Sequence, residues 1–272
     1  MVLPAYVGAL DRKRQRETAL ITGASSGIGL DLAQLMAPDF DLIITARNQS
    51  ELEKIARELE ASHGNHVHVI PADLSQPEAP EQLFSEIARR GLPVDVLINN
   101  AGFGLYGPFA ESDPKASLAM VEVNIAALTA LTRLALPGMI ERKRGRIMNV
   151  ASTAGFQPGP LMAVYYATKA YVIMFSEAIA NELEGSGVSV TCFCPGATAT
   201  KFAGRANMEE SRLFKMGAMK SIEVAKAGYK GMMAGKGMVI PGLLNKTIAM
   251  SVRFSPRKLV TAISRSLQEK AK

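Results

Sequence analysis

The sequence predicts an α/β fold of the doubly wound, Rossmann-like kind: a parallel sheet of about seven strands with helices on both faces. Two observations support this prediction. Apolar runs of strand length alternate along the 272 residues with longer segments of helical period, which is typical of repeated βαβ units. The runs LIIT (42–45) and VLI (96–98) contain no alternating polar positions, as expected of strands buried on both faces.

In the first half of the chain, each expected strand leads into a helix with its own boundary signal. TALIT (18–22) runs into glycines and a helix at 27–37, which ends before Pro38. DLIITA (41–46) precedes a helix that Ser50 and Glu53 open with capping-box spacing. The remaining expected elements of this half are strands at 66–70 and 94–99, with a helix at 77–90 between them.

The second half repeats the pattern. Pro114, after Ser112 and Asp113, is typical of a first helical turn, and this helix is expected to reach about Arg142. The other expected elements are strands at 146–152, 188–194 and 237–241, helices at 161–184 and 220–234, and an amphipathic helical tail broken at Pro256. No linker or repeat divides the chain. We therefore expect an N-terminal extension (1–17), one domain (18–245) and a basic C-terminal tail (246–272).

Composition argues against several classes of function. Hydrophobic residues make up 48% of the chain, enough for a packed core, and the 6% aromatic content without tryptophan disfavours nucleic-acid binding by base stacking. Residues 241–272 hold seven basic residues and one acidic residue, which equals the whole net charge of +6. The remaining residues are balanced, so the high isoelectric point does not indicate a nucleic-acid-binding face.

The two cysteines, Cys192 and Cys194, are one residue apart and would lie on one face of a strand. A bond between them would close almost no loop, so we expect reduced thiols and a cytoplasmic location. No run reaches 18 apolar residues, and the charges follow the apolar start instead of preceding it. Neither a membrane-spanning helix nor a signal peptide is expected.

The segment TGASSGIG (22–29) stands between the first expected strand and its helix. Its glycines allow backbone N–H groups to approach a phosphate, and the helix N-terminus adds a positive dipole end. The spacing is not G-x-G-x-x-G, there is no Walker lysine, and glycines before a helix are often only a turn. The position after the first strand of a doubly wound pattern nevertheless favours a dinucleotide site.

The end of the second expected strand indicates which dinucleotide binds. Folds that bind NAD usually place a carboxylate there for the ribose 2′-hydroxyl, whereas residues 45–48 are Thr-Ala-Arg-Asn. A guanidinium at Arg47 would bind a 2′-phosphate that a carboxylate would repel. We therefore predict NADP(H), with NAD(H) less favoured; a solvated arginine at a helix start is the alternative.

Four residues form a candidate catalytic set. Tyr165 and Lys169 are four apart in an expected helix and share a face. A nearby ammonium would lower the pKa of the phenol. Ser152, at the end of the fifth strand, could hold a carbonyl oxygen that Tyr165 protonates. Asn124 is a poor helix former in mid-helix among apolar residues, which suggests an inward-facing functional amide. Each signal alone is weak, and together they indicate a site at the strand ends of one sheet.

In these residues the chain resembles the short-chain dehydrogenase/reductase family, in its NADP-preferring type. The resemblance covers roughly residues 18–242. Its motifs are TGASSGIG (22–29), AD (72–73), NNAG (99–102), Asn124, Ser152, Tyr165-x-x-x-Lys169 and Pro195-Gly196.

The resemblance implies roles for these positions. Tyr165 would be the general acid in reduction, Ser152 would position the substrate oxygen, and Lys169 would hydrogen-bond the nicotinamide ribose. Asn124 would hold a water in a proton relay ending at Lys169. Asp73 would meet the adenine and Thr200 the nicotinamide amide. The complete expected cofactor set is Gly23, Ser25, Ser26, Gly27, Ile28, Gly29, Arg47, Asn48, Asp73, Leu74, Asn100, Ala101, Gly102, Tyr165, Lys169, Pro195, Gly196, Thr198 and Thr200.

Three features leave alternatives open. His63, His66 and His68 fit surface or edge-strand packing better than a metal site, and no metal is expected. Residues 198–219, with Phe202, Met208, Phe214, Met216 and Met219, are either a mobile lid over a hydrophobic substrate or ordinary packing. The tail (246–272) fits a solvated surface or a subunit contact better than a peripheral membrane contact.

These observations lead to an NADP(H)-dependent oxidoreductase that acts on a carbonyl or secondary alcohol, with a hydrophobic ketone or acyl substrate. A nucleotide-sensing regulatory protein on the same fold is the alternative, which the intact set of Ser152, Tyr165 and Lys169 disfavours. The resemblance also implies a homodimer or homotetramer, through the helices at 114–142 and 161–184.

Overall fold

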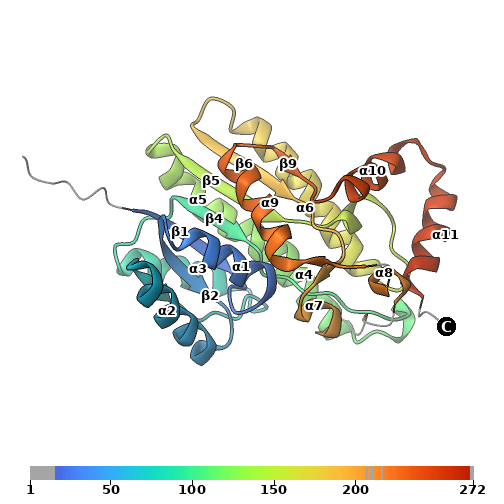
Figure 1. Ribbon diagram of the computed structural model, residues 1–272, viewed down its shortest axis with the longest axis horizontal. Coiled ribbons are helices and arrows are strands. Elements are labelled where there is room, and N and C mark those ends of the chain that lie inside the picture. Colours follow the sequence, from blue (N-terminus) through green and yellow to red (C-terminus); the bar gives the residue numbers. More distant parts are fainter. Residues whose placement is uncertain (1–15, 206–207, 209–210, 216, 270–272) are drawn as a thin grey trace, which may run out of the picture.

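A computed structural model describes residues 16–205, 208, 211–215 and 217–269 (Figure 1). Apart from residues 16 and 17, the expected N-terminal extension lies outside the described residues, as do residues 270–272 of the tail. The described chain forms a seven-stranded parallel sheet in the order β3-β2-β1-β4-β5-β6-β9. This order confirms the predicted doubly wound fold.

The strands are close to the predicted ranges. They are β1 (Glu17–Thr22), β2 (Phe40–Thr45), β3 (Val67–Val69), β4 (Val96–Asn99), β5 (Gly145–Val150), β6 (Val188–Phe193) and β9 (Met238–Val239). A separate short pair, β7 (Thr198–Ala199) with β8 (Met219–Lys220), was not predicted. The strand order reverses between β1 and β4, and ligands of doubly wound sheets bind at the carboxyl ends of the strands at such a point.

Helices cover both faces of this sheet. On one face α1 (Gly27–Met36), α2 (Gln49–His63) and α9 (Ser221–Met233) pack their buried residues against the strands. On the other face lie α3 (Ala79–Arg89), α5 (Leu128–Glu141) and α6 (Ala163–Glu182). Because both faces are covered, side chains such as Leu20 and Ile21, which point to opposite faces of β1, are both completely buried.

The helix predicted at 114–142 is continuous but not uniform. It consists of α4 (Pro114–Val121), a π-helical segment η2 (Glu122–Ala127) and α5. By length and composition this helix could cross a membrane, with a mean hydropathy of 1.5, and 44% of its most apolar window is buried inside the protein. Leu131, Ala135 and Met139 of this helix belong to the buried core on one face of the sheet.

The prediction that Ser50 caps the N-terminus of α2 is wrong. Asn48, not Ser50, is the N-cap, and its Oδ1 accepts hydrogen bonds from the Glu51 backbone N–H at 3.2 Å and the Ser50 hydroxyl at 2.9 Å. Asparagine caps helices as well as serine does, so spacing alone did not choose between the two.

The last part of the chain lies at one end of the molecule, far from α2 (Figure 1). It contains α10 (Leu243–Ser251), the short turn η4 (Val252–Phe254) and α11 (Arg257–Gln268), so the predicted break at Pro256 is confirmed. The remaining short elements are η1 (Phe109–Glu111), η3 (Thr153–Phe156), α7 (Lys201–Arg205) and α8 (Arg212–Lys215).

Candidate active site

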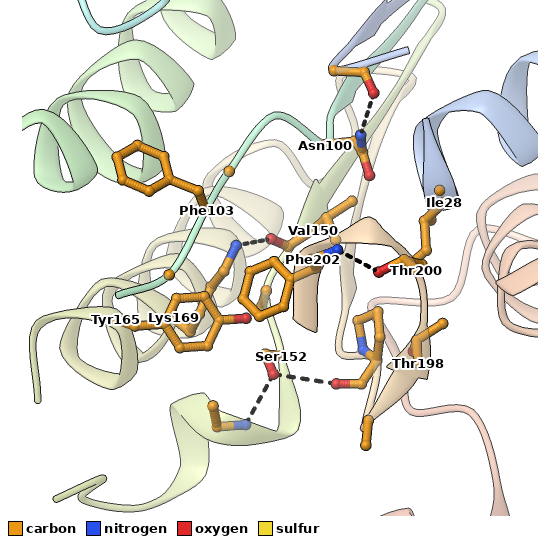
Figure 2. Close-up of a pocket in the computed structure, with 18 of the residues that line it drawn as sticks. Ile28, Asn100, Phe103, Val150, Ser152, Tyr165, Lys169, Thr198, Thr200 and Phe202 are labelled. Carbon is orange, nitrogen blue, oxygen red and sulfur yellow. Dashed lines mark hydrogen bonds between the residues drawn. The ribbon is translucent and has the colours of Figure 1, made fainter. Parts of the chain in front are cut away.

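A cavity of about 890 Å³ opens at the carboxyl ends of β1, β4, β5 and β6, where the strand order reverses (Figure 2). This volume lies at the upper end of the range for small-molecule and cofactor sites. Every residue of the predicted catalytic and cofactor sets lines the cavity except Gly29 and Asn124, which lie behind its wall. The structure therefore brings together side chains that the sequence spreads over some 180 positions.

The glycine loop between β1 and α1 forms the phosphate end of the cavity. Gly23 has a φ of +67°, a conformation that favours glycine, and its N–H donates to the Thr45 carbonyl at 2.8 Å. A Cβ on Gly29 would lie 2.4 Å from the Gly23 carbonyl oxygen, so the turn closes only without a side chain there. Ser26, the N-cap of α1, makes no capping hydrogen bond, and the first amides of α1 remain available to an anion.

Thr22 joins this loop to the loop after β4. Its Oγ1 accepts from the backbone N–H groups of Asn100 and Ala101, each at 2.9 Å, and donates to the Ile98 carbonyl at 3.2 Å. The Asn100 side chain in turn donates to the Thr22 carbonyl at 2.9 Å. Sequence reasoning had treated Thr22 only as the first letter of a motif, whereas it holds two walls of the cavity together.

The opposite rim of the cavity carries the residues that were predicted to distinguish NADP(H) from NAD(H). Arg47 and Asn48 lie two and three residues after the end of β2 and line the cavity, and Arg47 is exposed. Asp73 also lines it, but its Oδ1 accepts from the Ser75 N–H at 3.1 Å and hydroxyl at 2.8 Å. The only free charge directly after β2 is thus a guanidinium, which fits a phosphate better than a sugar hydroxyl.

Tyr165 and Lys169 lie on one face of α6 and point into the cavity (Figure 2). The Lys169 Nζ donates to the Val150 carbonyl at 2.8 Å and lies 5.8 Å from the centre of the Tyr165 ring. The ammonium is buried, and this burial lowers the pKa of Lys169 to about 8. The β5 carbonyl therefore fixes a lysine that is easily deprotonated beside the phenol.

Ser152 lies two residues beyond β5 on the cavity wall that Tyr165 also lines, and its hydroxyl is near enough to the Tyr165 phenol to lower the pKa of that phenol. The Ser152 Oγ also donates to the Pro195 carbonyl at 3.3 Å and accepts from the Ala154 N–H at 3.1 Å (Figure 2). These contacts fix the Ser152 hydroxyl on the cavity wall near Tyr165. A substrate carbonyl oxygen placed there would meet both.

The pKa expectation for Tyr165 needs correction. Burial raises the pKa of the Tyr165 phenol well above its usual value, and the neighbouring Ser152 hydroxyl offsets only part of that effect. The predicted lowering by the Lys169 ammonium is absent in the cofactor-free protein. The reason is that desolvation penalises the phenolate more than a lysine 5.8 Å from the ring centre favours it.

Asn124 is buried in the π-helical segment η2, whose wider turn interrupts the regular hydrogen-bond ladder. Its Oδ1 accepts from the Phe103 N–H at 3.1 Å, and its Nδ2 donates to the Phe103 carbonyl at 3.0 Å and the Thr168 Oγ1 at 3.1 Å. A Cβ on Gly102 would lie 3.0 Å from the Asn124 Oδ1 and 3.4 Å from the Lys169 Nζ. The inward-facing amide predicted from sequence is present, and it anchors the loop after β4 beside Lys169.

The loop after β6 closes the cavity. Thr198 Oγ1 donates to the Gly196 carbonyl at 2.9 Å, and Thr200 Oγ1 accepts from the Phe202 N–H at 3.2 Å (Figure 2). A Cβ on Gly27 would lie 3.1 Å from the Thr200 side chain, so this loop contacts the glycine loop directly.

Part of segment 198–219, for which a lid and ordinary packing were both predicted, lies against the candidate catalytic side chains. The Phe202 ring lies 5.3 Å from the Tyr165 ring, and Met208 is buried in a small cluster with Met162 and Tyr166. Both Phe202 and Met208 line the cavity, as does Met219. The segment therefore forms an apolar wall of the site. Met216 and the Phe214 side chain lie outside the described residues.

The C-terminal helix supplies cavity residues that sequence reasoning missed. Ser264, Leu267 and Gln268 of α11 line the cavity, and the Gln268 Nε2 donates to the Tyr166 hydroxyl. The Tyr106 hydroxyl donates to the Gln268 carbonyl at 2.8 Å. Tyr166 and Gln268 are 102 residues apart, and no motif or periodicity relates them. Within the described residues, no group of three or more His, Cys, Asp or Glu side chains could hold a metal ion.

Comparison with known proteins agrees with this geometry. A family model of short chain dehydrogenases matches residues 17–211, more than half of the chain. The ketoacyl reductase HetN of Nostoc sp. is 32% identical over 88% of this chain and 79% of its own length. A very-long-chain 3-oxoacyl-CoA reductase of Phaeosphaeria nodorum is 37% identical over 64% of this chain, which spans only 52% of that reductase.

Among solved structures, a short-chain dehydrogenase from Sphingobium yanoikuyae in complex with NADPH is 30% identical, with a TM-score of 0.78. The match covers 88% of this chain and 93% of that one. The family match, the strand order and the Ser152–Tyr165–Lys169 arrangement lead to one conclusion: this chain belongs to the short-chain dehydrogenase family and is an oxidoreductase.

Proposed function

We propose that this protein is an NADPH-dependent reductase that converts a hydrophobic ketone, in the first place a 3-oxoacyl thioester, into the corresponding alcohol. The observation that carries the proposal is that Ser152 and Tyr165 line the same cavity as the glycine loop, with Lys169 Nζ 5.8 Å from the centre of the Tyr165 ring. The relatives named ketoacyl and very-long-chain 3-oxoacyl-CoA reductases support the acyl substrate.

In this proposal the chain's own residues perform the proton chemistry. When bound, NADPH supplies the hydride that reduces the carbonyl carbon. The Ser152 and Tyr165 hydroxyls donate hydrogen bonds to the carbonyl oxygen and stabilise the charge that develops on it. Tyr165 then donates its proton to that oxygen. The raised pKa of Tyr165 keeps the phenol protonated at neutral pH, so that this proton is available. The positive charge of Lys169 favours the tyrosinate that remains, until a proton from solvent restores the phenol.

The choice of NADPH rests on Arg47 and on the absence of a carboxylate from residues 45–48. The glycine loop and the uncapped N-terminus of α1 fit the pyrophosphate. The neighbour from Sphingobium yanoikuyae is in complex with NADPH, which supports this choice. The ratio of kcat/KM for NADPH and NADH tests it, and a preference for NADH would contradict it.

The test of the catalytic assignment is Tyr165→Phe, which keeps the ring that packs against Phe202 and removes only the hydroxyl. We expect turnover of a 3-oxoacyl thioester to fall by about 10²–10⁴-fold, the usual contribution of a general acid, while NADPH still binds. Tyr166→Phe is the matched control, since it removes the neighbouring hydroxyl on the same helix. Equal turnover in Tyr165→Phe and the unchanged enzyme would refute Tyr165 as the acid.

We further propose that two copies pair through α4, α5 and α6. Leu118, Ile140, Tyr171 and Met174 are large apolar side chains left exposed on these helices. Light scattering of a Leu118→Glu/Met174→Glu variant tests the pairing. An unchanged mass would place the subunit contact elsewhere.

A reducing compartment such as the cytoplasm is proposed from two thiols, one in β6 and one directly after it. Cys192 and Cys194 are buried and free, with their Sγ atoms 3.6 Å apart.

A further inference from the structure

The C-terminal end of the fold exposes an unusual amount of apolar surface. We use "C-terminal surface" for the exposed side chains of α10, η4 and α11. Seven of the thirteen large apolar side chains that are exposed in the described part of the chain lie between residues 243 and 263. They are Leu243, Leu244, Ile248, Met250, Phe254, Leu259 and Ile263. A gathering of this kind on a folded protein usually marks an interaction site.

Helix α11 shows that this exposure is not a side effect of core packing. Its inner face buries Val260 and two polar residues, Ser264 and Gln268, the last two about 2% exposed or less. Its outer face leaves Leu259 and Ile263 slightly more than half exposed, one helical turn apart. Phe254, on the turn that precedes α11, is 87% exposed. The apolar stripe therefore faces away from the protein, towards a partner outside it.

The charge of the same surface restricts what that partner can be. The same elements also expose five basic side chains, Lys246, Arg253, Arg257, Lys258 and Arg265. Of these five, only Arg265 forms an ion pair with a carboxylate of the described residues, with Glu269 at 3.4 Å. Pairing this surface with its own copy would bring the unpaired positive charges together, which disfavours a symmetric subunit contact. Apolar side chains among cations match the interface of an anionic lipid bilayer.

The C-terminal surface is also continuous with the cavity. Leu243, Leu244 and Ile248 of α10 line the cavity although each is at least half exposed, so they form its rim. On the inner side, Leu267 and Gln268 of α11 line the wall. Figure 1 shows α10 and α11 together at the end of the molecule opposite α2. An apolar molecule that leaves a bilayer under this surface would reach the cavity without crossing water.

We propose that the C-terminal surface docks on anionic membranes and that a hydrophobic substrate enters the cavity from the bilayer past the rim of α10. The docking step stands on the exposed apolar and basic side chains alone. The entry step rests on the proposed reductase function. Sequence reasoning favoured a solvated surface or a subunit contact for this tail, because it did not show that the apolar residues face outward beside the cavity.

Docking is tested by co-sedimentation of the full chain with vesicles of phosphatidylcholine, with and without phosphatidylglycerol. The intact protein should bind the anionic vesicles, and high salt should release most of it. Two variants leave the cavity lining untouched: Phe254→Ser/Ile263→Ser removes apolar side chains, and Arg253→Glu/Arg257→Glu reverses charge. The charge reversal should lower vesicle binding by about tenfold or more, since a single basic residue near an anionic surface contributes about fivefold. The apolar variant should lower it by about tenfold or more, since full burial of one such side chain contributes about tenfold or more.

The matched control for charge is Lys54→Glu/Arg57→Glu on α2, where both side chains are exposed at the far end of the molecule. This variant should bind vesicles as the intact protein does. If it loses binding to the same extent, the effect comes from net charge and the docking surface is refuted. Failure of the intact protein to bind anionic vesicles refutes it as well.

Entry is tested by comparing a long-chain ketone embedded in vesicles with a short, water-soluble ketone. The Phe254→Ser/Ile263→Ser variant should raise KM for the embedded ketone about tenfold and leave kcat and KM for the soluble ketone unchanged. If the variant has the same KM as the intact protein for each of the two ketones, entry from the bilayer is refuted. The Tyr165→Phe variant is expected to lose turnover, so its binding to anionic vesicles measures docking separately from catalysis. If Phe254→Ser/Ile263→Ser or Arg253→Glu/Arg257→Glu changes the mass of the protein in light scattering without vesicles, the C-terminal surface is a subunit contact instead.

Discussion

The buried ammonium of Lys169 makes a prediction about stability that can be worked out from the structure. The side chain is 5% exposed, and burial lowers its pKa to about 8 from an ordinary value of 10.5. Near pH 7 both the folded and the unfolded chain carry the proton. The folded protein then bears the full cost of the buried charge, roughly 3 kcal/mol of unfolding free energy.

Replacing this lysine by methionine should therefore stabilise the cofactor-free protein while removing its activity. Lys169→Met keeps the length of the side chain and removes the charge, but it leaves the Val150 carbonyl without its 2.8 Å hydrogen bond. The lost bond costs about 1 kcal/mol, which leaves a net gain of about 2 kcal/mol near pH 7. The melting temperature should rise by roughly 4–8 °C.

The pH dependence separates this explanation from a simple packing effect. Between the folded pKa of about 8 and the higher unfolded pKa, the unfolded chain binds more protons, so the intact protein gains stability as pH rises. The advantage of Lys169→Met should be constant below about pH 7 and fall to less than about 1 kcal/mol by about pH 9.5. Urea unfolding at both pH values measures it, with the exposed Lys54→Met as control. A lower stability of Lys169→Met near pH 7, or an advantage that does not change with pH, would refute the reasoning.

Three further predictions follow from the cavity walls. Arg47→Ala should raise KM for NADPH by about 10–100-fold and leave KM for NADH unchanged, since a charge-assisted contact to phosphate contributes about 1.5–3 kcal/mol; a parallel rise for both cofactors would contradict the role of Arg47. Gly29→Ala should abolish NADPH binding in a fluorescence titration, because its Cβ would lie 2.4 Å from the Gly23 carbonyl oxygen; retained affinity would show that the turn can relax. Tyr166→Phe leaves the buried Gln268 amide without its partner, so calorimetry should show a loss of about 1–3 kcal/mol while kcat changes less than in Tyr165→Phe; unchanged stability would mean that water replaces the hydroxyl.

Much of the fold could be predicted because its signals are local. The apolar runs that became β2 and β4 are buried on both faces, and this leaves a readable mark in sequence. The glycine loop and the four-residue step from Tyr165 to Lys169 are also local, because a turn and one helical turn set their geometry. Boundaries were less accurate: Asn48, not Ser50, caps α2, since several polar residues there are equally good caps.

By itself, the sequence determined the alternation of strands and helices, the phosphate loop and the Ser152, Tyr165 and Lys169 set. Each of these depends on contacts between residues near in sequence or on a motif. Only the tertiary structure decided how the phenol titrates, because burial by distant segments outweighs the effect of Lys169 and raises the pKa of Tyr165. It also decided that Gln268 meets Tyr166 and that the apolar side chains of α10 and α11 face outward beside the cavity. Such contacts arise from the packing of elements a hundred residues apart, which no local pattern encodes.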